Sequence, residues 1–588
     1  MKKDKGITLI ALVVTIVVLL ILAGVSIGLV LGENGIINKA KDARDKYAQA
    51  VGNDQIEIGK LENWLKSEID NSTDEDLYEC GANEPNLKDG MIPVYYDETN
   101  KIWRKADESN KNKQWYDYDN KKWANIVTVS EADKNLRRAE VGTEIPMEKI
   151  TTFFVWVPRY AYSITSGYRQ GNGATGSIDV TFLKGNTNIG ADGKTYEADY
   201  DETKLSAGNK TPKIVHPGFT IGNSQLAGLW VAKFEASGTT SNGTAVGNAD
   251  GSSTYNPVKP DSTSYVKILP SKISWRDITI GESEYRCMQM SASQDKYGWT
   301  SDVNSHLIKN DEWGAVAYLC YSKYGNVPKI NGVGTWKSDG SYWYNLYTGA
   351  GIKGNEGDYI DFSEGTHGYN TELGRLASTT GNEYGIYDMA GGAWDWVAGY
   401  LDNGNSSLNT YGVSTSNSQV KYFENGKLNS EYSDLWNTYE VSEEEKGNKI
   451  KVGTSEISQD ALWDWNNKTI EYNTARLRLT EANFNNMAKH KGTGIYETTT
   501  DFSYFAPCGS TEDSREWFNT AKDTTSETNR EYGLTWNNDT VDVGHAFIPF
   551  LVRGSGNMNP TRATILGVRF TYGTEWDYLN GFRPVLAF

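Results

Sequence analysis

The sequence has few of the residues on which most catalytic and metal sites depend. Its 588 residues include only five histidines and four cysteines. The histidines lack the HExxH or HxH spacing of metal-binding pairs, and the cysteines form no CxxC pair, which argues against zinc. The chain also has no GxSxG nucleophile elbow and no P-loop. The common signatures of hydrolases, zinc proteins and nucleotide-binding proteins are therefore absent.

Positive charge is scarce relative to negative charge. The chain has 58 Lys and Arg against 76 Asp and Glu, a net charge of -18. Nucleic acid is not expected as a partner, because phosphate binding needs a cationic surface. Proline is also scarce, at 14, whereas there are 59 glycines, 36 tyrosines and 19 tryptophans. This composition and length favour a globular protein with many strands and long loops, divided into two or three domains.

The four cysteines leave the disulfide pattern open. They are Cys80, Cys287, Cys320 and Cys508. If these residues lie outside the cell, one or two disulfides would be compatible with the sequence, but sequence alone does not give their pairing. Cys320 lies in the apolar helical stretch "WGAVAYLCY" and is interpreted as a buried thiol.

One long uncharged run lies at the N-terminus, from Ile7 to Gly32, after three lysines and Gly6. At about 1.5 Å per helical residue, it is long enough to cross the ~30 Å hydrocarbon core of a membrane. A secretory signal peptide has a shorter apolar core followed by a cleavage site. We therefore expect a membrane-spanning helix that continues as an amphipathic stalk to about residue 70. The lysines place the short leader in the cytoplasm and the rest of the chain outside.

The order "KG" followed by "ITLIALVV" resembles the type IV prepilin signal. The resemblance implies a leader of residues 1–6, cleavage after Gly6, methylation of the new terminus at Ile7, and a pilin-like helix over residues 7–70. It implies other pilin subunits as partners, and a location at the cell surface, anchored in the cytoplasmic membrane or incorporated in a type IV-like pilus. Ala11 stands where the family carries glutamate. A minor or tip subunit therefore fits better than a repeating major pilin.

Residues 71–130 are predicted to form a linker and a small β-rich module. The stretches "MIPVYYDETNKIWRKAD" and "QWYDYDNKKWANIVTV" contain short aromatic strands separated by Asp, Asn and Lys turns. Trp103, Trp115 and Trp123 are predicted to form the core of this β-meander rather than a sugar-stacking surface.

The remaining chain, residues 150–588, contains five informative stretches. The region opens with "TTFFVWVPRYAYSI", which is predicted to be a buried strand. The order along the whole region is strand, helix, Gly/Trp loop, long loops and a closing strand at the C-terminus. The stretches are "GLWVAKFEAS", "KNDEWGAVAYL", "GNEYGIYDMAGGAWDWV", "VRGS" and "GFRPVL". They resemble the formylglycine-generating enzyme and sulfatase-modifying-factor family, a version of the C-type lectin fold. The resemblance implies an α+β protein, with the pilin-like helix and the small β-meander preceding a large C-type-lectin-like domain.

The activity of that family is not expected here. Its oxidation chemistry binds copper through a pair of cysteines near the C-terminus. Residues 553–588 contain no cysteine, and Cys508 stands alone upstream. Copper is therefore not expected as a cofactor, no catalytic residues are assigned, and the chain is predicted not to be an enzyme.

The resemblance also implies a structural calcium ion at the Gly/Trp loop. Mapped residue by residue, its ligands are the side chains of Asp388 and Asp395 and the carbonyl groups of Gly391 and Ala393. Calcium takes six to eight oxygen ligands, and a glycine-rich bend can turn carbonyls inward. Gly392 stands where the family has asparagine. The alternative interpretation is that the two aspartates cap turns while the neighbouring tryptophans pack in the core.

By position, the segment between "VRGS" and "NGFRPVLAF" resembles the variable region of C-type-lectin-fold binders diversified by retroelements. The resemblance implies a ligand-binding region within residues 553–588. The residues assigned to ligand contact are Asn557, Asn559, Thr564, Ile565, Tyr572, Thr574, Trp576, Asp577 and Leu579. The alternative is that they are ordinary strand and loop residues of a fixed domain.

Together these features predict a surface-displayed, pilus-associated adhesin or receptor-binding protein. Its ligand would be a protein or glycan on another surface, because aromatic and Asn-rich loops on a rigid scaffold are typical of recognition sites. A cell-surface enzyme built on the same fold and a structural minor pilin without a ligand remain alternatives.

Overall fold

The computed structural model describes residues 80–588, apart from gaps at 171–174, 206–207, 247–259, 300–302, 330–334, 337–341, 344–346, 352–366, 403, 405, 441–448, 453–454, 459–488, 500–532, 535, 537–539, 542–548, 555–563, 572 and 574–579. The described residues belong to one compact unit. Gly6, Ile7 and the predicted helix over residues 7–70 lie outside them. Within the described part of the chain, no helix has the length and apolar character needed to cross a membrane.

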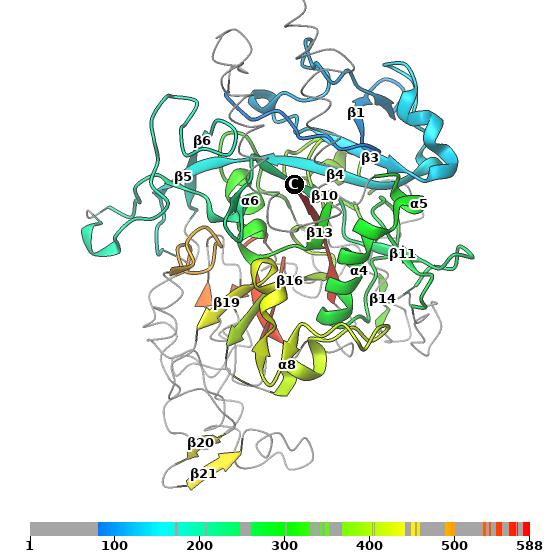
Figure 1. Cartoon of the computed structure of the whole chain (residues 1–588). Coiled ribbons are helices and arrows are strands. Elements are labelled where there is room, and N and C mark those ends of the chain that lie inside the picture. Colours follow the sequence, from blue (N-terminus) through cyan, green and yellow to red (C-terminus); the bar gives the residue numbers. More distant parts are fainter. Residues whose placement is uncertain are drawn as a thin grey trace, which may run out of the picture. The chain divides into compact units, whose positions relative to one another are not determined.

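The first sheet has seven strands, and each neighbouring pair is antiparallel. All nine residues of its central strand β4 are buried, as the apolar run "ITTFFVWVP" predicts. Figure 1 shows this sheet in the upper part of the molecule. In spatial order its strands are β13 (Asn304–Leu307), β27 (Pro584–Ala587), β10 (Gly228–Ala232), β4 (Ile150–Pro158), β3 (Asn125–Val129), β1 (Ile92–Asp97) and β2 (Ile102–Lys105).

The strands predicted as a separate small module belong to this sheet. β3 pairs with β4, and Asn125 lies opposite Val155. Trp103, Trp115 and Trp123 are buried, so their assignment to a core is confirmed. The boundary after residue 130 is corrected because a two- or three-stranded meander needs further strands or a helix to cover its apolar face. Here the neighbouring strand β4 extends that face.

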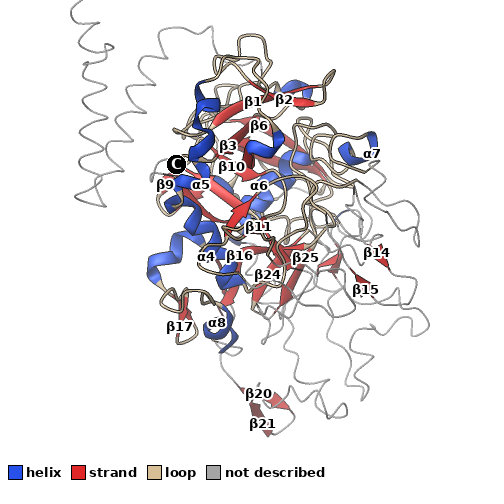
Figure 2. Ribbon diagram, turned by 90° about the vertical axis from the view of Figure 1, so that its right-hand side faces the viewer, coloured by secondary structure: helices blue, strands red, loops and turns tan. Residues whose placement is uncertain are grey.

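Two helices contribute most of the helical core that the structure describes, α4 (Ile280–Ala292) and α6 (Asn310–Cys320). All of α6 is buried, which confirms the helix predicted from "KNDEWGAVAYL". The Glu312 carboxylate caps its first turn by accepting a 2.8 Å hydrogen bond from the Lys309 backbone N–H. Figure 2 shows these helices beside the strands of both large sheets.

The second sheet is built around β16 (Trp394–Asp402), the strand that follows the Gly/Trp loop. β24 (Phe550–Arg553) lies antiparallel to it, whereas β19 (Asn437–Glu440) and β26 (Asn580–Phe582) pair with it in parallel. β25 (Val568–Thr571) pairs with β24, and the short strands β23 (Thr540–Val541) and β22 (Gly533–Leu534) follow. The described part of the chain is therefore a mixed α and β structure with few helices and several sheets, and it contains the predicted strand, helix, Gly/Trp loop and closing strand in that order.

Three of the four cysteines lie in the described part of the chain. Cys80, Cys287 and Cys320 are free thiols. The Cys320 thiol is buried and donates to the carbonyl oxygen of Val316 at 3.0 Å, which confirms its interpretation as a buried thiol. Cys508 lies outside the described residues, and none of the three described cysteines forms a disulfide.

Candidate functional site

The predicted calcium loop and the predicted ligand-binding region meet at the N-terminal end of β16. We call Asp388–Ala393 the fingerprint turn and residues 555–579 the binding segment. β24 runs antiparallel to β16, so Arg553 lies opposite Asp395. The backbone N–H of Gly391 donates to the carbonyl oxygen of Gly554 at 2.8 Å. The point where the chain enters the binding segment therefore adjoins the fingerprint turn.

The sequence of the fingerprint turn explains its path. Asp388, Gly391 and Gly392 have positive φ angles of 61°, 78° and 73°. Glycine adopts this region without a steric penalty, and aspartate is one of the few other residues that enters it readily. Both Asp388 carboxylate oxygens lie 2.9 Å from the backbone nitrogen of Gly349, which donates to them. Asp388 thus holds Gly349, 39 residues earlier in the chain, against the fingerprint turn.

A buried acidic cluster lies beneath the turn. It consists of Glu235, Asp388 and Asp395, with exposures of at most 1%, and the guanidinium of Arg583. Arg583 contacts Asp395 Oδ2 at 3.2 Å and also donates to the carbonyl oxygens of Ala232 and Tyr387. The Asp395 Oδ1 atom has no hydrogen-bond partner. Three buried carboxyl groups thus lie together, and Arg583 pairs with one of them.

The electrostatics of this cluster favour a proton on Glu235. Burial, followed by the charges of Asp395 and Asp388, raises the pKa of Glu235 well above its usual range. Burial also raises the pKa of Asp395 to about 7, although Arg583 opposes this shift. Glu235 accepts a 2.9 Å hydrogen bond from the Ala393 backbone N–H and contacts the Ser274 hydroxyl. Glu235 therefore ties the chain just after β10 to the fingerprint turn.

The described contacts do not assemble a calcium site. Asp388 accepts backbone hydrogen bonds, and Asp395 is paired with Arg583, whose positive charge opposes a metal ion at the same carboxylate. Across the residues with a described placement, no three Asp, Glu, His or Cys side chains are arranged to hold a metal ion. Calcium at Asp388, Gly391, Ala393 and Asp395 stays a prediction of the resemblance. Trp396 is fully buried and Trp394 partly buried, in agreement with the alternative interpretation.

Two of the nine predicted ligand contacts lie in the described structure. Thr564 is partly exposed, and its carbonyl oxygen closes a turn by accepting from the Gly567 N–H at 3.0 Å. Ile565 is fully buried, and its carbonyl oxygen accepts from the indole of Trp313 at 2.7 Å. The assignment of Ile565 is therefore corrected, because its side chain packs in the core. The residues outside the described part are Asn557, Asn559, Tyr572, Thr574, Trp576, Asp577 and Leu579.

Buried polar contacts hold the chain where it enters the binding segment. Arg553 is fully buried and donates to Asn310 Oδ1 at 2.7 Å and to the carbonyl oxygen of Thr493 at 2.9 Å. Gly554 has a φ of 87°, and a Cβ atom there would lie 3.1 Å from the Trp313 ring. These contacts position the entry to the segment against helix α6.

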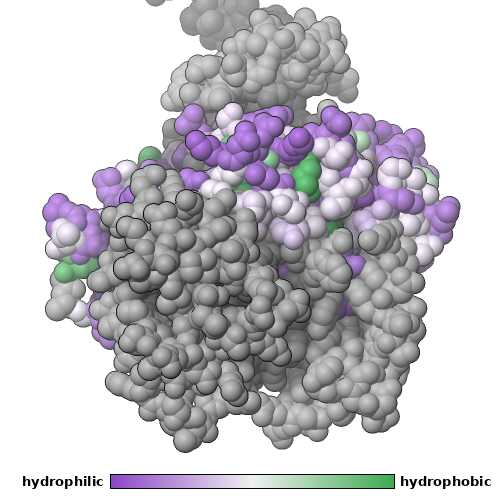
Figure 3. Space-filling view, turned by 90° about the horizontal axis from the view of Figure 1, so that it is seen from below, coloured by the Kyte–Doolittle hydropathy of each residue, from purple (hydrophilic) through white to green (hydrophobic). Residues whose placement is uncertain are grey.

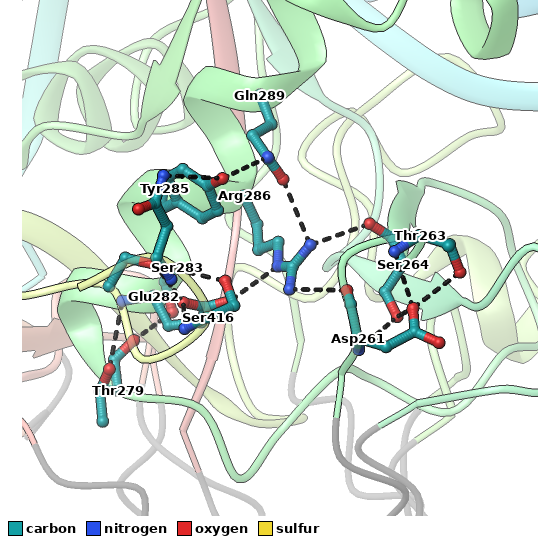
Figure 4. Close-up of polar contacts among 12 residues, drawn as sticks. Asp261, Thr263, Ser264, Thr279, Glu282, Ser283, Tyr285, Arg286, Gln289 and Ser416 are labelled. Carbon is teal, nitrogen blue, oxygen red and sulfur yellow. Dashed lines mark hydrogen bonds and ion pairs between the residues drawn. The ribbon is translucent and has the colours of Figure 1, made fainter. Parts of the chain in front are cut away.

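A second polar cluster surrounds Arg286 on α4 (Figure 4). Its guanidinium pairs with Glu282 at 2.7 Å and donates to the carbonyl oxygens of Ser264 and Asp261. Ser416 donates to Glu282 from both its hydroxyl and its backbone N–H. Because both charged groups are almost completely buried and well bonded, this cluster joins two loops to α4 and offers no open binding position.

A third polar cluster surrounds the buried carboxyl group of Glu497. The hydroxyl groups of Tyr162, Tyr200 and Tyr318 donate to it over 2.8–3.0 Å, and the Gly492 N–H donates at 2.7 Å. Burial raises the pKa of Glu497 above its usual range. This arrangement fastens residues 489–499 to the core and leaves the carboxyl group inaccessible to a substrate.

The described outer surface has little apolar character. In the view of Figure 3, hydrophilic residues dominate the coloured part of the surface. Among the described residues, the large exposed hydrophobic side chains are Val141, Met147 and Ile189. Val141 and Met147 lie six residues apart and Ile189 lies further along the chain, and single exposed apolar residues of this kind are normal on a protein surface. The described surface therefore supplies no alternative apolar binding patch.

Three buried charged residues that organise this region were not assigned a role from the sequence. They are Lys233, Glu235 and Arg583, each at most 1% exposed. The sequence does mark these residues, because in "GLWVAKFEAS" and "GFRPVL" charged residues interrupt apolar stretches. A charge in such a position must find a partner when the chain folds. The sequence does not reveal which partner it finds.

Known proteins add no residue assignments to this site. A scan against models of protein families and a search of curated proteins both find no match for this chain. The function proposed below rests on the sequence features and contacts already described.

Proposed function

We propose that this chain is a surface-displayed, pilus-associated binding protein of the adhesin or receptor-binding type. Its binding face would be formed by residues within 553–588 on a C-type-lectin-like scaffold. The observation that carries the proposal is the junction of the fingerprint turn with the binding segment through the 2.8 Å contact between Gly391 and Gly554. This junction attaches a polar, aromatic segment to a buried sheet.

The anchors on both sides of the segment support this role. Arg553 is fully buried at its entry, and Asn580 is fully buried where β26 pairs with Trp394. The exposed residues of a segment anchored in this way can change without disturbing the core, and recognition sites are commonly placed on rigid scaffolds for that reason. Tyr, Trp and Asn side chains, as in this segment, supply contact area and hydrogen bonds at low entropic cost.

The remaining parts of the proposal concern location, partners and diversification. The prepilin-like N-terminus supports display outside the cytoplasmic membrane, with other pilin subunits as partners. The binding partner would be a protein or a glycan on another surface. Diversification by a retroelement is proposed from the position and composition of the segment. A calcium ion at the fingerprint turn would have a structural role.

A binding assay tests the proposal directly. Cells that display the full chain are compared with cells that display the double variant Trp576→Ala, Asp577→Ala, on surfaces that the wild-type chain binds. Loss of a central aromatic contact costs about 2 kcal/mol or more, so we expect at least a roughly 30-fold weaker interaction. The control is Asn242→Ala in an exposed turn. Equal binding by all three chains at equal surface levels would contradict the proposal.

Sequencing the gene across a population tests the diversification separately. Substitutions should be confined to about residues 555–580, and position 565 should remain apolar because Ile565 is buried. Substitutions scattered evenly along the domain would contradict a variable region.

A further inference from the structure

The first sheet contains a lysine and an asparagine in direct contact in the core. The Lys233 Nζ atom donates to Asn125 Oδ1 at 2.8 Å, and both residues have an exposure of 0%. Lys233 also donates to the carbonyl oxygens of Glu383 and Gly385, at 2.5 and 2.8 Å. Three fixed acceptor oxygens thus surround the amine, and one of them belongs to the carboxamide group; the two N–H groups of a neutral amine can donate to two of the three at a time.

The surroundings of Lys233 favour the uncharged amine. Its Nζ atom lies 5.2 Å from the Trp103 ring centroid, 5.5 Å from that of Tyr387 and 5.9 Å from that of Phe234. No ion pair of Lys233 with a carboxylate occurs among the described residues. Burial lowers the pKa of Lys233 well below its usual range, although the charge of Glu383 opposes this shift. A neutral lysine amine is a nucleophile, whereas an ammonium group is not.

Asn125 presents its carboxamide in a fixed orientation. Its Nδ2 atom donates to the carbonyl oxygens of Trp123 and Tyr384, at 2.9 and 2.8 Å. These two bonds direct Oδ1 towards the lysine, and the hydrogen bond from Nζ polarises the carbonyl group. The amide carbon is one covalent bond beyond the atom that Lys233 already contacts.

The strand register explains why the two side chains meet. Asn125 on β3 and Val231 on β10 both lie opposite Val155 of the central strand β4. Lys233 is two residues beyond Val231, and its backbone N–H donates to the carbonyl oxygen of Phe153. Side chains two residues apart on a strand share a face of the sheet. The lysine and the asparagine therefore reach across the same face of β4.

We propose that Lys233 and Asn125 form an intramolecular isopeptide bond. The neutral Nζ atom attacks Asn125 Cγ, the Nζ–Cγ bond forms, and the Cγ–Nδ2 bond breaks. One Nζ proton moves to Nδ2, which leaves as ammonia, so the reaction needs no oxidant, reductant or cofactor. Exclusion of water from the core prevents hydrolysis from competing with attack by the amine.

The bond would join the two strands that flank β4. A cross-link between residues 125 and 233 closes a long loop and restricts the unfolded chain, as a disulfide does, but it is not broken by reducing agents. None of the three described cysteines supplies a covalent cross-link to this unit. This inference does not depend on the proposed binding function.

Peptide mass spectrometry of the full-length chain tests the proposal. After denaturation and trypsin digestion, we expect no cleavage after Lys233, because its side chain is acylated. The expected product is a branched peptide in which Trp123–Lys134 is joined to Ile214–Lys267, with a mass lower than the sum of the two peptides by one ammonia. Two separate linear peptides at these positions, with normal cleavage after Lys233, would overturn the proposal.

Three variants confirm the origin of the branched peptide. Lys233→Met and Asn125→Ala should each abolish it, whereas Lys309→Met should retain it. Lys309 is a matched control because it is also largely buried, but it pairs with Asp311 at 3.4 Å, and carboxylate partners raise its pKa. The wild-type digest decides the question even if a core variant fails to fold.

Discussion

At the scale of single residues, the acidic cluster shows how the cost of burying a charge competes with the stabilisation from an ion pair. Arg583 lies 3.2 Å from Asp395 and keeps one negative charge compensated. Glu235 and Asp388 share the same dry environment, and a second uncompensated charge there would cost several kcal/mol. Protonation of Glu235 removes that cost. The ion pair of Arg583 with Asp395, a proton on Glu235 and hydrogen bonds from backbone N–H groups therefore act together in this cluster.

This balance predicts a specific pH dependence. The pKa of Glu235 is raised on folding, so the folded state holds a proton that the unfolded state releases. This contribution to stability is complete below the unfolded pKa and is lost as pH rises through the folded value, at up to about 1.4 kcal/mol per pH unit. Glu235→Gln mimics the protonated form. We expect the variant to be more stable than the wild type at about pH 8 and similar to it at about pH 4.

Urea unfolding at several pH values measures this difference. The matched control is Glu148→Gln, because Glu148 is exposed in the short helix before β4. That variant should follow the wild-type curve. If the Glu235→Gln curve also ran parallel to the wild-type curve, Glu235 would not carry the buried proton.

At the scale of elements, Gly554 connects strand β24 to the binding segment. Its φ of 87° lies in the left-handed region, and its neighbours include the Trp313 ring and the Met389 carbonyl oxygen. A side chain at this position therefore meets both a backbone penalty and a steric one. The end of the strand depends on glycine for two separate physical reasons.

Comparing Gly554→Ala with Gly142→Ala should separate the backbone penalty from the steric penalty. Gly142 has a similar φ of 86°, but no atom of the described structure lies within 4 Å of its added Cβ. Gly142→Ala should cost about 1–2 kcal/mol from the backbone alone. Gly554→Ala should cost about 1–3 kcal/mol more because of crowding against α6. Chemical denaturation gives both values, and equal costs would show that Trp313 and Met389 move aside freely.

At the scale of the whole molecule, distant parts of the sequence form one sheet and one core. The indole of Trp103 donates to the hydroxyl of Tyr369 at 3.0 Å, although the residues are 266 positions apart. The Tyr96 N–H similarly donates to the Tyr384 hydroxyl at 3.0 Å. These contacts join β1 and β2 to the region just before the fingerprint turn. The N-terminal strands therefore support the residues that lead into the site.

The substitution Trp103→Ala tests this integration. Removing a large buried aromatic side chain costs about 3–5 kcal/mol, and the loss should lower the unfolding midpoint of the whole described unit in a single transition. Tyr95→Ala, a change at a partly exposed neighbour on β1, should have a smaller effect. Calorimetry would show two separate transitions, with only the smaller one shifted, if residues 80–130 were an independent module.

Local patterns in the sequence determined the main elements of the described fold. The apolar run of β4, the helical stretch of α6 and the Gly/Trp motif before β16 each carry their signal within about ten to twenty residues. The buried thiol of Cys320 and the core positions of Trp103, Trp115 and Trp123 followed from the same patterns. These features were predictable because burial of a continuous apolar face selects the element that contains it.

Only the tertiary structure decided which of these elements share a core. It joined the N-terminal strands to β4, buried Ile565 against α6, and paired Asp395 with Arg583 across 188 positions. It also placed Lys233 beside Asn125, although 108 positions separate them. Such pairings depend on strand order and register, which no local periodicity encodes. The sequence alone determined that charged residues interrupt apolar stretches, and the fold determined which partners those residues meet.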